Sequence, residues 1–456
     1  MAISTINSTS SVQPTLRSLF TRQRVLGIIF LLLAFTMWYF FALGLGSIAE
    51  SKELEVSDVI TTFKLPISSA PGDLFDWELS SATALNFLAI VSAFLGGIQL
   101  WRGFGKWANM ILALVIGLFV FGFLTWGAAG KSLNLGGLLS ATLVRAVPIT
   151  LGAMSGILSE RAGIVNIAIE GMMLTGALVG AFAGSVASLW LPESFFASIF
   201  EEQGLKILGL VIGLICAMLA GMILSAVHGV FSIRYKINQI VSGTVINIFA
   251  VGFTSYLSAR FLQKYQEYNN PGTFRPFEIP ILSDIPILGP IFFRHNMFVY
   301  SMLIIIVVLH VALYYTRWGL RLRAVGEHPK AADTLGINVL RTRWMAILLS
   351  GLMAGFAGGY FTLGSVPRFD EGLTAGRGFI GLAAMIFGNW NPIGSFGASL
   401  LFGFTDALQT KLAILKLPIP SEFLLMIPYV ATMIILAGVV GKGQMPAADG
   451  QPYDKE

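Results

Sequence analysis

The polar groups that could do chemistry in this chain lie inside long apolar runs. Glu170 is a carboxylate with apolar sequence on both sides, and Asn166 precedes it by one helical turn, which predicts that both lie on one helix face. Because an ionisable group at membrane depth is costly, it usually faces a bundle interior or a wet cavity and marks a transport pathway. The alternative is a structural ion pair, with Arg145 as the candidate partner.

Motifs for ATP hydrolysis and for metal catalysis are missing from the sequence. The string closest to a phosphate-binding loop, TWGAAGKS at 125–132, begins with Thr where the motif needs Gly, and no strand is expected before it. No histidine pairs with a glutamate at metal-ligand spacing. The single cysteine, Cys216, stands in an apolar run, which excludes a disulfide framework within the chain. We therefore expect no catalytic residues, no metal, no cofactor and no enzymatic activity.

The composition predicts an all-α integral membrane protein. The 456 residues are 55% hydrophobic and 12% charged, with a mean hydropathy of +0.77, whereas a soluble domain is typically about 25% charged. About ten or eleven stretches approach the ~20 apolar residues that cross a bilayer as a helix. The predicted spans are 25–47, 83–101, 108–129, 133–158, 164–189, 207–231, 239–261, 297–315, 344–366, 379–412 and 421–441. Asn389 to Pro392 interrupt 379–412, which predicts a broken or re-entrant pair.

The placement of charge predicts how the chain crosses the membrane. The net charge is +5, and the basic residues fall in short loops beside the spans, which indicates membrane orientation rather than nucleic-acid binding. We expect an uncleaved first span, a cytoplasmic tail at 1–24 and an acidic loop outside at 50–80. The basic loop 316–343 and the tail 443–456 are expected in the cytoplasm.

A short helix is predicted inside the loop 316–343. Pro329 occupies a favoured first helical position and Gly336 a favoured stop, so Pro329 to Leu335 should form two helical turns. Ala331, Ala332 and Leu335 give this helix a small apolar face. A helix this short is marginal alone in water, so something must cover it. Packing on its own bundle and docking to a soluble partner are equally good interpretations.

Three segments together resemble one family of transporters. They are SERAGIVNIAIEGMMLTGALVGA at 159–181, GLRLRAVGEHPKAADTLGINV at 319–339 and GRGFIGLAAMIFGNWNPIGSFGASLLFG at 376–403. In this order they are similar to the permease subunits of ABC importers for nucleosides and simple sugars, and to the shorter of the two permeases that usually pair. The resemblance covers roughly 133–442, so we divide the chain into a three-span extension at 25–130 and a permease core at 131–442.

The resemblance implies a type II ABC importer-like helical bundle with a cytoplasmic coupling helix that enters a groove on an ATPase subunit. Carried over by position, the coupling residues are Glu327, His328, Pro329, Ala331, Ala332 and Gly336. The implied partners are a second permease in a heterodimer, the ABC ATPase and an extracytoplasmic substrate-binding lipoprotein. The implied location is the plasma (inner) membrane, where the chain would be multi-pass with a cytoplasmic N-terminus.

The expected function is ATP-driven import of nucleosides or simple sugars, which the sequence does not separate. An ion-gradient-driven carrier is the alternative, since Glu170 and the broken segment could bind a coupling ion. An enzyme acting on lipid ranks last, because the spans lack a catalytic histidine or paired carboxylates.

The solute path is predicted along polar and aromatic residues of the spans. Nucleosides and sugars are polar but mostly uncharged, so a cavity that passes them needs hydrogen-bonding groups and aromatic faces. We expect Asn166, Asn247, Phe379 and Asn389 to line this path, with Glu170 nearby as a structural or gating charge. In the alternative interpretation each amide only bonds a neighbouring helix.

Overall fold

The computed structural model describes residues 21–65, 76–190, 202–415 and 443–455, together with Phe423 and Met426. Within these residues nine helices are long and apolar enough to cross a membrane. They are Arg22–Ser51, Ser81–Trp101, Gly105–Gly127, Leu135–Glu160, Ile169–Trp190, Lys206–Arg234, Gln239–Leu262, Met297–Tyr315 and Val339–Ser365. The prediction of an all-α membrane protein is confirmed, and each of these helices corresponds to one predicted span. Of the predicted span at 421–441, only Phe423 and Met426 are among the described residues.

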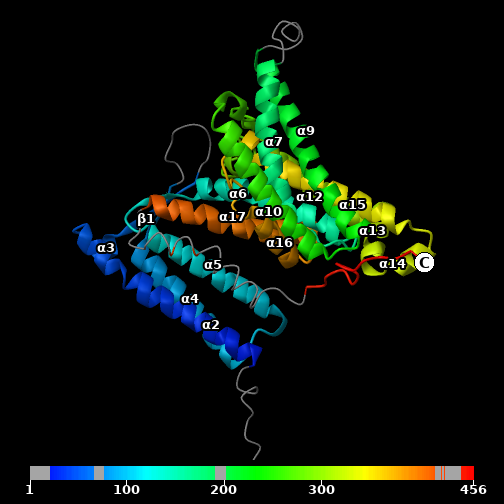
Figure 1. Ribbon diagram of the computed structural model, residues 1–456. Coiled ribbons are helices and arrows are strands. Elements are labelled where there is room, and N and C mark those ends of the chain that lie inside the picture. The colour runs from blue at the N-terminus through cyan, green and yellow to red at the C-terminus, as the bar shows by residue number, and fades with distance from the viewer. Residues whose placement is uncertain are drawn as a thin grey trace, which may run out of the picture. The chain divides into compact units, whose positions relative to one another are not determined.

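The described chain forms two compact units (Figure 1). Unit 1 comprises 21–65, 76–135 and Leu415, and unit 2 comprises 136–190, 202–414 and the C-terminal segment 443–455. The helices of unit 1 are α2 (Arg22–Thr36), which continues through η1 (Met37–Ala42), α3 (Leu45–Ser51), α4 (Ser81–Trp101), η3 (Gly105–Trp107) and α5 (Ala108–Gly127). Its core contains fully buried Phe30, Met37, Leu85 and Val115.

A small sheet fills part of the acidic loop that was predicted as 50–80. After η2 (Val56–Asp58), β1 (Ile60–Lys64) pairs antiparallel with β2 (Asp76–Ser80) and parallel with β3 (Ser132–Asn134), in the order β2-β1-β3. Thr61 and Phe63 alternate inward and are fully buried. Because β1 pairs with β3, which is distant in the sequence, the charge pattern of the loop did not reveal this sheet.

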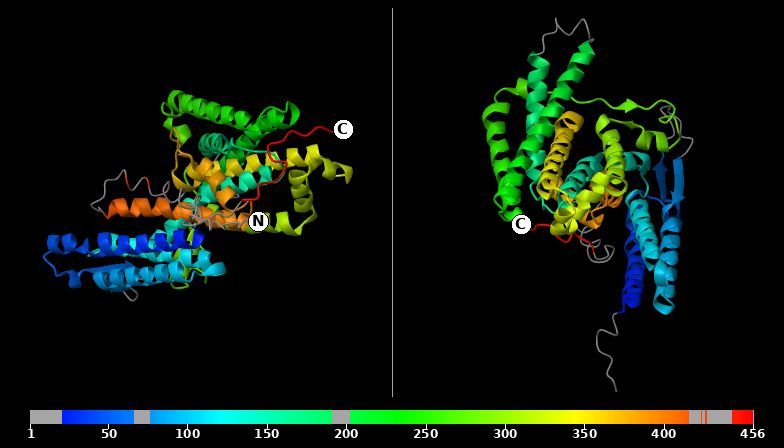
Figure 2. Two further views of the ribbon diagram at one scale, coloured as in Figure 1. Left: turned by 90° about the horizontal axis from the view of Figure 1, so that it is seen from below. Right: turned by 90° about the vertical axis from the view of Figure 1, so that its right-hand side faces the viewer.

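Unit 2 is built around three helices whose apolar spans are mostly buried. Figure 2 shows the helices from two further directions. These are α6 (Leu135–Glu160), α7 (Ile169–Trp190) and α15 (Val339–Gly359), which continues into η7 (Tyr360–Ser365). In their apolar spans 83%, 67% and 78% of residues are buried, compared with 33% in each of the spans that contain α9, α10 and α12. The first three therefore form the centre of unit 2, and the other three lie toward its periphery.

The remaining elements of unit 2 complete the bundle and its loops. The helical ones are α9 (Glu202–Gly229) with η4 (Val230–Arg234), α10 (Gln239–Leu257) with η5 (Ser258–Leu262), η6 (Gln266–Asn269), α11 (Leu288–Phe292), α12 (Met297–Tyr315), α13 (Arg317–Glu327), α14 (Pro329–Thr334), α16 (Arg377–Phe387) and α17 (Pro392–Ile414). A two-stranded ribbon pairs β4 (Phe277–Glu278) with β5 (Arg294–His295).

Glycines determine how closely α7, α9 and α15 pack. Figure 1 shows α7 and α9 side by side. A Cβ added at Gly176 would lie 3.0 Å from Gly355 Cα, and one at Gly355 would lie 2.3 Å from Ala217 O. No side chain fits at such distances without displacing backbone. Small residues therefore let these three helices approach through their backbones, as in other membrane bundles.

The predicted break in the stretch 379–412 is confirmed as a helical hairpin. α16 ends at Phe387, the chain turns with positive φ at Asn389 (55°) and Trp390 (52°), and Pro392 begins α17. The Asn391 side chain caps the new helix by accepting from the backbone N–H of Ile393 at 2.9 Å. With 11 residues, α16 extends only about 16 Å and spans half of the ~30 Å hydrocarbon core.

The predicted start of the span at 164–189 is wrong for its first five residues. The chain turns at Gly163 (φ 83°), and 164–168 is not helical, so α7 begins at Ile169. The Asn166 side chain accepts from the backbone N–H of Ala168 at 3.1 Å, which favours a local turn over helix. Asn166 and Glu170 therefore do not share a helix face.

Candidate functional site

One end of unit 2 gathers loops and basic residues, and we call it the basic end. The backbone N–H of Ala448 donates to Gly326 O at 2.9 Å, and Arg161 Nε donates to Trp390 O at 3.0 Å. These bonds bring the C-terminal segment, the loop after α6, the loop after α13 and the hairpin turn to one place. The basic residues at this end are Arg161, Arg234, Lys236, Arg317, Arg321, Arg323, Lys330, Arg341 and Arg343.

The predicted short helix in the loop 316–343 is confirmed as α14. Pro329 is its first residue, His328 Nδ1 accepts from the backbone N–H of Ala331 at 3.1 Å, and Gly336 follows with φ 80°. Glu327 ends the preceding helix α13, and its carboxylate accepts from the backbone N–H of Ala447 at 3.3 Å. The loop is thus a well-capped helical turn held against the C-terminal segment (Figure 1).

The predicted apolar face of α14 is divided by the fold. Ala332 is 2% exposed and packs with Val325, Val339 and Tyr453 inside the protein, whereas Ala331 is exposed and Leu335 is 82% exposed. The expectation that Ala331, Ala332 and Leu335 form one apolar face is therefore wrong for Ala332. The reason is that one side of so short a helix must cover its own bundle.

The C-terminal segment provides a pH-dependent contact at the basic end. Burial raises the pKa of the Asp449 carboxyl to about 7, and the polar contacts with the Glu160 side chain and the Gly450 backbone, together with the positive charge of Arg343, only partly lower it. At pH values between the ordinary Asp pKa of 3.8 and about 7, Asp449 holds a proton when the segment is docked but not when it is undocked. Docking therefore weakens as the pH rises through this range.

This pH dependence is a testable property of the segment 443–455. Hydrogen exchange at the backbone N–H of Ala448 and Gln451, which donate to Gly326 and Ala448, should be slower at pH 6 than at pH 8 after correction for intrinsic rates. The Asp449→Asn variant should reduce this difference, because its amide stays neutral. Protection that rises from pH 6 to pH 8 in the unchanged protein would contradict the assignment.

Glu170 caps the half-helix α16 in the interior of unit 2. Its Oε1 accepts from Thr374 Oγ1 at 2.6 Å and from the backbone N–H of Gly376 at 2.9 Å, and its Oε2 accepts from the backbone N–H of Gly378 at 2.6 Å. A carboxylate at a helix N-terminus satisfies free N–H donors and opposes the helix dipole. The geometry assigns Glu170 a structural role, and Thr374 is a partner that the sequence did not reveal.

Asn166 and Asn247 are buried and bond neighbouring segments. Asn247 on α10 accepts from the backbone N–H of Gly171 at 2.8 Å and donates to Ile167 O at 2.9 Å. Asn166 Nδ2 donates to Ser350 Oγ on α15 at 2.9 Å. Together with Glu170 they hold the start of α7 against α10, α15 and α16. Their place on the solute path stays a prediction, while these bonds give them a packing function.

Phe379 and Asn389 lie at opposite ends of α16 and do not meet. Phe379 is 47% exposed near the start of the helix. Asn389 is exposed in the hairpin turn at the basic end, where its Oδ1 accepts from the backbone N–H of Gln444 at 2.8 Å. Of the predicted path residues, these two retain exposed surface.

Arg145 pairs with an aspartate that the sequence analysis did not single out. Arg145 Nη1 donates to Asp406 Oδ2 at 2.8 Å, and Arg377 Nη2 donates to the same oxygen at 3.3 Å. The suggested ion pair between Arg145 and Glu170 is therefore wrong. Asp406 sits in the apolar run LFGFTDALQT of α17, so an isolated charge in a span was the signal that could have found it.

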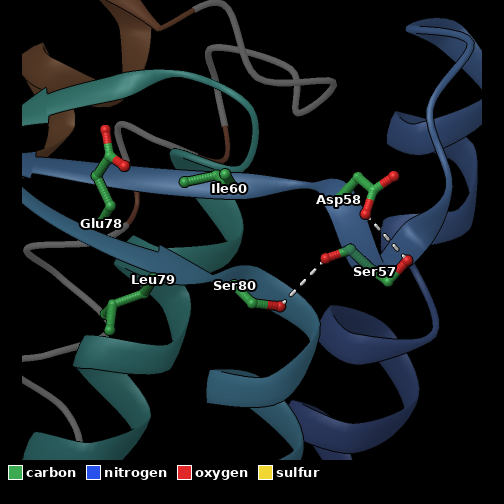
Figure 3. A pocket seen from close by; sticks show the side chains of 6 residues that line it. All are labelled: Ser57, Asp58, Ile60, Glu78, Leu79 and Ser80. Atoms are coloured by element: carbon green, nitrogen blue, oxygen red, sulfur yellow. Dashed lines mark hydrogen bonds between the residues drawn. The ribbon is translucent and has the colours of Figure 1, made fainter.

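A shallow hollow of about 370 Å³ lies in unit 1 beside the β1–β2 ribbon (Figure 3). Its lining residues are Ser57, Asp58, Ile60, Glu78, Leu79 and Ser80. The polar side chains around it form hydrogen bonds within the lining itself. Ser80 Oγ, for example, donates to Ser57 O at 3.4 Å. Among the described residues no group of three His, Cys, Asp or Glu could hold a metal ion.

The comparisons with known proteins decide the family. The family described as "Branched-chain amino acid transport system / permease component" matches residues 138–437. The chain belongs to this permease family. It is therefore a multi-pass membrane permease and not an enzyme, and the family excludes the alternative of an ion-gradient-driven carrier. No solved structure matches the chain significantly.

The permease has similar relatives among ABC transporter subunits. It is 38% identical to the guanosine ABC transporter permease protein NupQ of Bacillus subtilis over 323 residues, which are 70% of this chain and 96% of NupQ. It is 40% identical to the nucleoside ABC transporter permease protein NupC of Lactococcus lactis, over 69% of this chain and 95% of NupC. Bacillus subtilis NupP, a second guanosine ABC transporter permease protein, is 26% identical over 66% of this chain and 83% of its own length.

Proposed function

We propose that this permease imports nucleosides across the cell membrane as one of two permeases in an ABC transporter. The observation that supports this proposal is the match to NupQ and NupC over 96% and 95% of their lengths at 38% and 40% identity. Two permeases of the guanosine transporter in one organism, NupQ and NupP, both match the chain, which supports a heterodimer. An ATPase subunit and an exported binding protein complete the proposed transporter.

The proposed orientation places the basic end in the cytoplasm. Nine basic side chains gather there, most of them at the ends of the spans and on the short helices between them, which is the distribution found on the cytoplasmic side of membrane proteins. The ATPase then docks on α14, whose outward residues are His328, Ala331, Leu335 and Gly336. An N-terminal tail in the cytoplasm agrees with the same alternation of spans, and residues before 138 form an extension outside the family match.

A chain of contacts leads from α14 to α16. Gly326 at the end of α13 packs on Arg161, since a Cβ there would lie 2.3 Å from Arg161 O. Arg161 in turn donates from Nη2 to Asn389 O at 3.2 Å in the hairpin turn. When the ATPase pulls on α14, this chain moves the half-helix α16 and so opens or closes the solute path. The mechanism is one of displacement, with no chemical step on the solute.

The test is uptake of radiolabelled guanosine by vesicles that contain the permease with the subunits encoded beside it. Uptake should require ATP and the ATPase subunit, and it should persist when ionophores collapse the proton and sodium gradients. A sugar such as ribose serves as the competing substrate in the same vesicles. ATP-dependent uptake of the sugar but not the nucleoside would overturn the substrate assignment, and uptake without the ATPase would overturn the mechanism.

A further inference from the structure

Three charged side chains meet inside unit 2, where α6, α16 and α17 pack. Arg145 lies about 15 Å along α6 from Leu135 at 1.5 Å per residue. Arg377 is the first residue of α16, about 16 Å from the hairpin turn at the basic end. Both measures place the cluster with Asp406 near the middle of a ~30 Å hydrocarbon core.

The cluster is partly open although it lies at membrane depth. The side chains of Arg145, Asp406 and Arg377 are 32%, 26% and 25% exposed. An open charge facing lipid is strongly disfavoured, so such groups face a bundle interior or a water-filled cavity. This face of α6, α16 and α17 therefore points away from lipid.

The segment before α16 supports a wet environment. Residues 366–376 are not helical, and Arg368 and Asp370 in it form an ion pair whose side chains are 64% and 49% exposed. Where such a segment leads to a half-helix that begins in the membrane, its irregular backbone is tolerated only beside protein or a water-filled cavity. The exposed ion pair indicates that this segment meets water.

Charges around the start of α16 are balanced, and Arg377, whose guanidinium carbon lies 5.9 Å from the centre of the Phe361 ring, makes only long hydrogen bonds. Arg145 and Arg377 are offset by Asp406 and by Glu170, which caps the helix. The hydrogen bonds that Arg377 donates to Thr374 O and to Asp406 are long, 3.4 Å and 3.3 Å, whereas Arg145 reaches Asp406 at 2.8 Å. A guanidinium has five N–H donors, so Arg377 retains donors for a passing ligand.

We propose that Arg377 contacts the solute within the translocation path, with Asp406 and Arg145 as its positioning residues. The inference rests on the proposed import function. A balanced set of charges neither attracts nor repels a neutral solute, while the planar fork of Arg377 can donate two hydrogen bonds to carbonyl or hydroxyl oxygens. The ligand class is therefore an uncharged polar solute with adjacent oxygen acceptors, as in nucleosides.

Cysteine labelling in the assembled transporter tests whether Arg377 faces water. The Arg377→Cys variant in a Cys216→Ala background should react with a water-soluble cationic thiol reagent, and saturating guanosine should slow the reaction about fivefold or more. The matched control is Ile304→Cys on α12, which is 62% exposed but apolar in its surroundings and should stay unlabelled. Absence of labelling at Arg377→Cys, or labelling that guanosine does not slow while the transporter binds it, overturns the proposal.

Conservative variants separate solute contact from a structural role and cover the case in which the cysteine variant does not fold. Arg377→Lys keeps the charge but loses the fork, so the KM for uptake should rise about tenfold with kcat nearly unchanged. Asp406→Asn should also raise KM. Asp406→Glu, which keeps the negative charge, should leave KM close to that of the unchanged transporter. An unchanged KM in Arg377→Lys overturns the proposal. If the unmodified transporter imports no nucleoside, the proposed function is wrong. The difference in labelling between Arg377→Cys and Ile304→Cys then still shows whether Arg377 is in contact with water.

Discussion

The Glu170→Leu variant is expected to lose the folded permease from the membrane. Leucine removes the acceptors of three donors at the start of α16, which are Thr374 Oγ1 and the backbone N–H groups of Gly376 and Gly378. Each buried donor left without a partner costs about 1–3 kcal/mol. Three of them approach the roughly 5–15 kcal/mol that typically separates folded from unfolded domains. The fraction that stays soluble in detergent after heating measures the loss.

Two companion variants make this result specific. Glu170→Gln retains one acceptor oxygen but turns an NH₂ group toward N–H donors, so its melting temperature should lie between those of the leucine variant and the unchanged protein. Glu371→Gln, at an exposed carboxylate in the segment before α16, should leave the melting temperature unchanged. A leucine variant as stable as the unchanged protein would show that Glu170 does not hold α16.

The second large effect is expected at Leu335. Leu335→Asp should leave the permease inserted but reduce ATP-dependent uptake tenfold or more, because a charge would enter the apolar surface where we propose that the ATPase docks. Burying an unpaired polar or charged group costs a few kcal/mol, and about 1.4 kcal/mol already corresponds to tenfold in affinity. Leu335 is 82% exposed, so the change should not disturb the permease itself.

Matched variants locate this effect on the outward side of α14. Ala331→Asp should reduce uptake in the same way, whereas Ala332→Asp should lower the amount of folded protein, since Ala332 is buried beside Val325. Leu54→Asp, at an exposed leucine of unit 1, should leave the coupling of ATP hydrolysis to uptake intact. Full uptake by the Leu335→Asp transporter would remove α14 as the docking element.

Local patterns in the sequence were sufficient for the membrane class, for nine of the predicted spans and for the break at Asn389 to Pro392. Apolar runs of about 20 residues determine which segments leave water, whatever they pack against. The hairpin at Asn389 to Pro392 and the helix that starts at Pro329 follow from residues that restrict the backbone locally. The family resemblance rests on continuous motifs of the same kind, so it too follows from the amino-acid sequence alone.

Only the tertiary structure decided what each polar side chain does. Glu170 bonds Thr374 across 204 residues and Arg145 bonds Asp406 across 261. A periodic pattern shows that a charge lies in a span, but its partner depends on which helices pack and at what depth. The same holds for Ala332, which faces inward, and for Asn166, whose segment leaves the helix to bond Ser350. Backbone conformation follows largely from neighbours in sequence, whereas burial and pairing follow from neighbours in space.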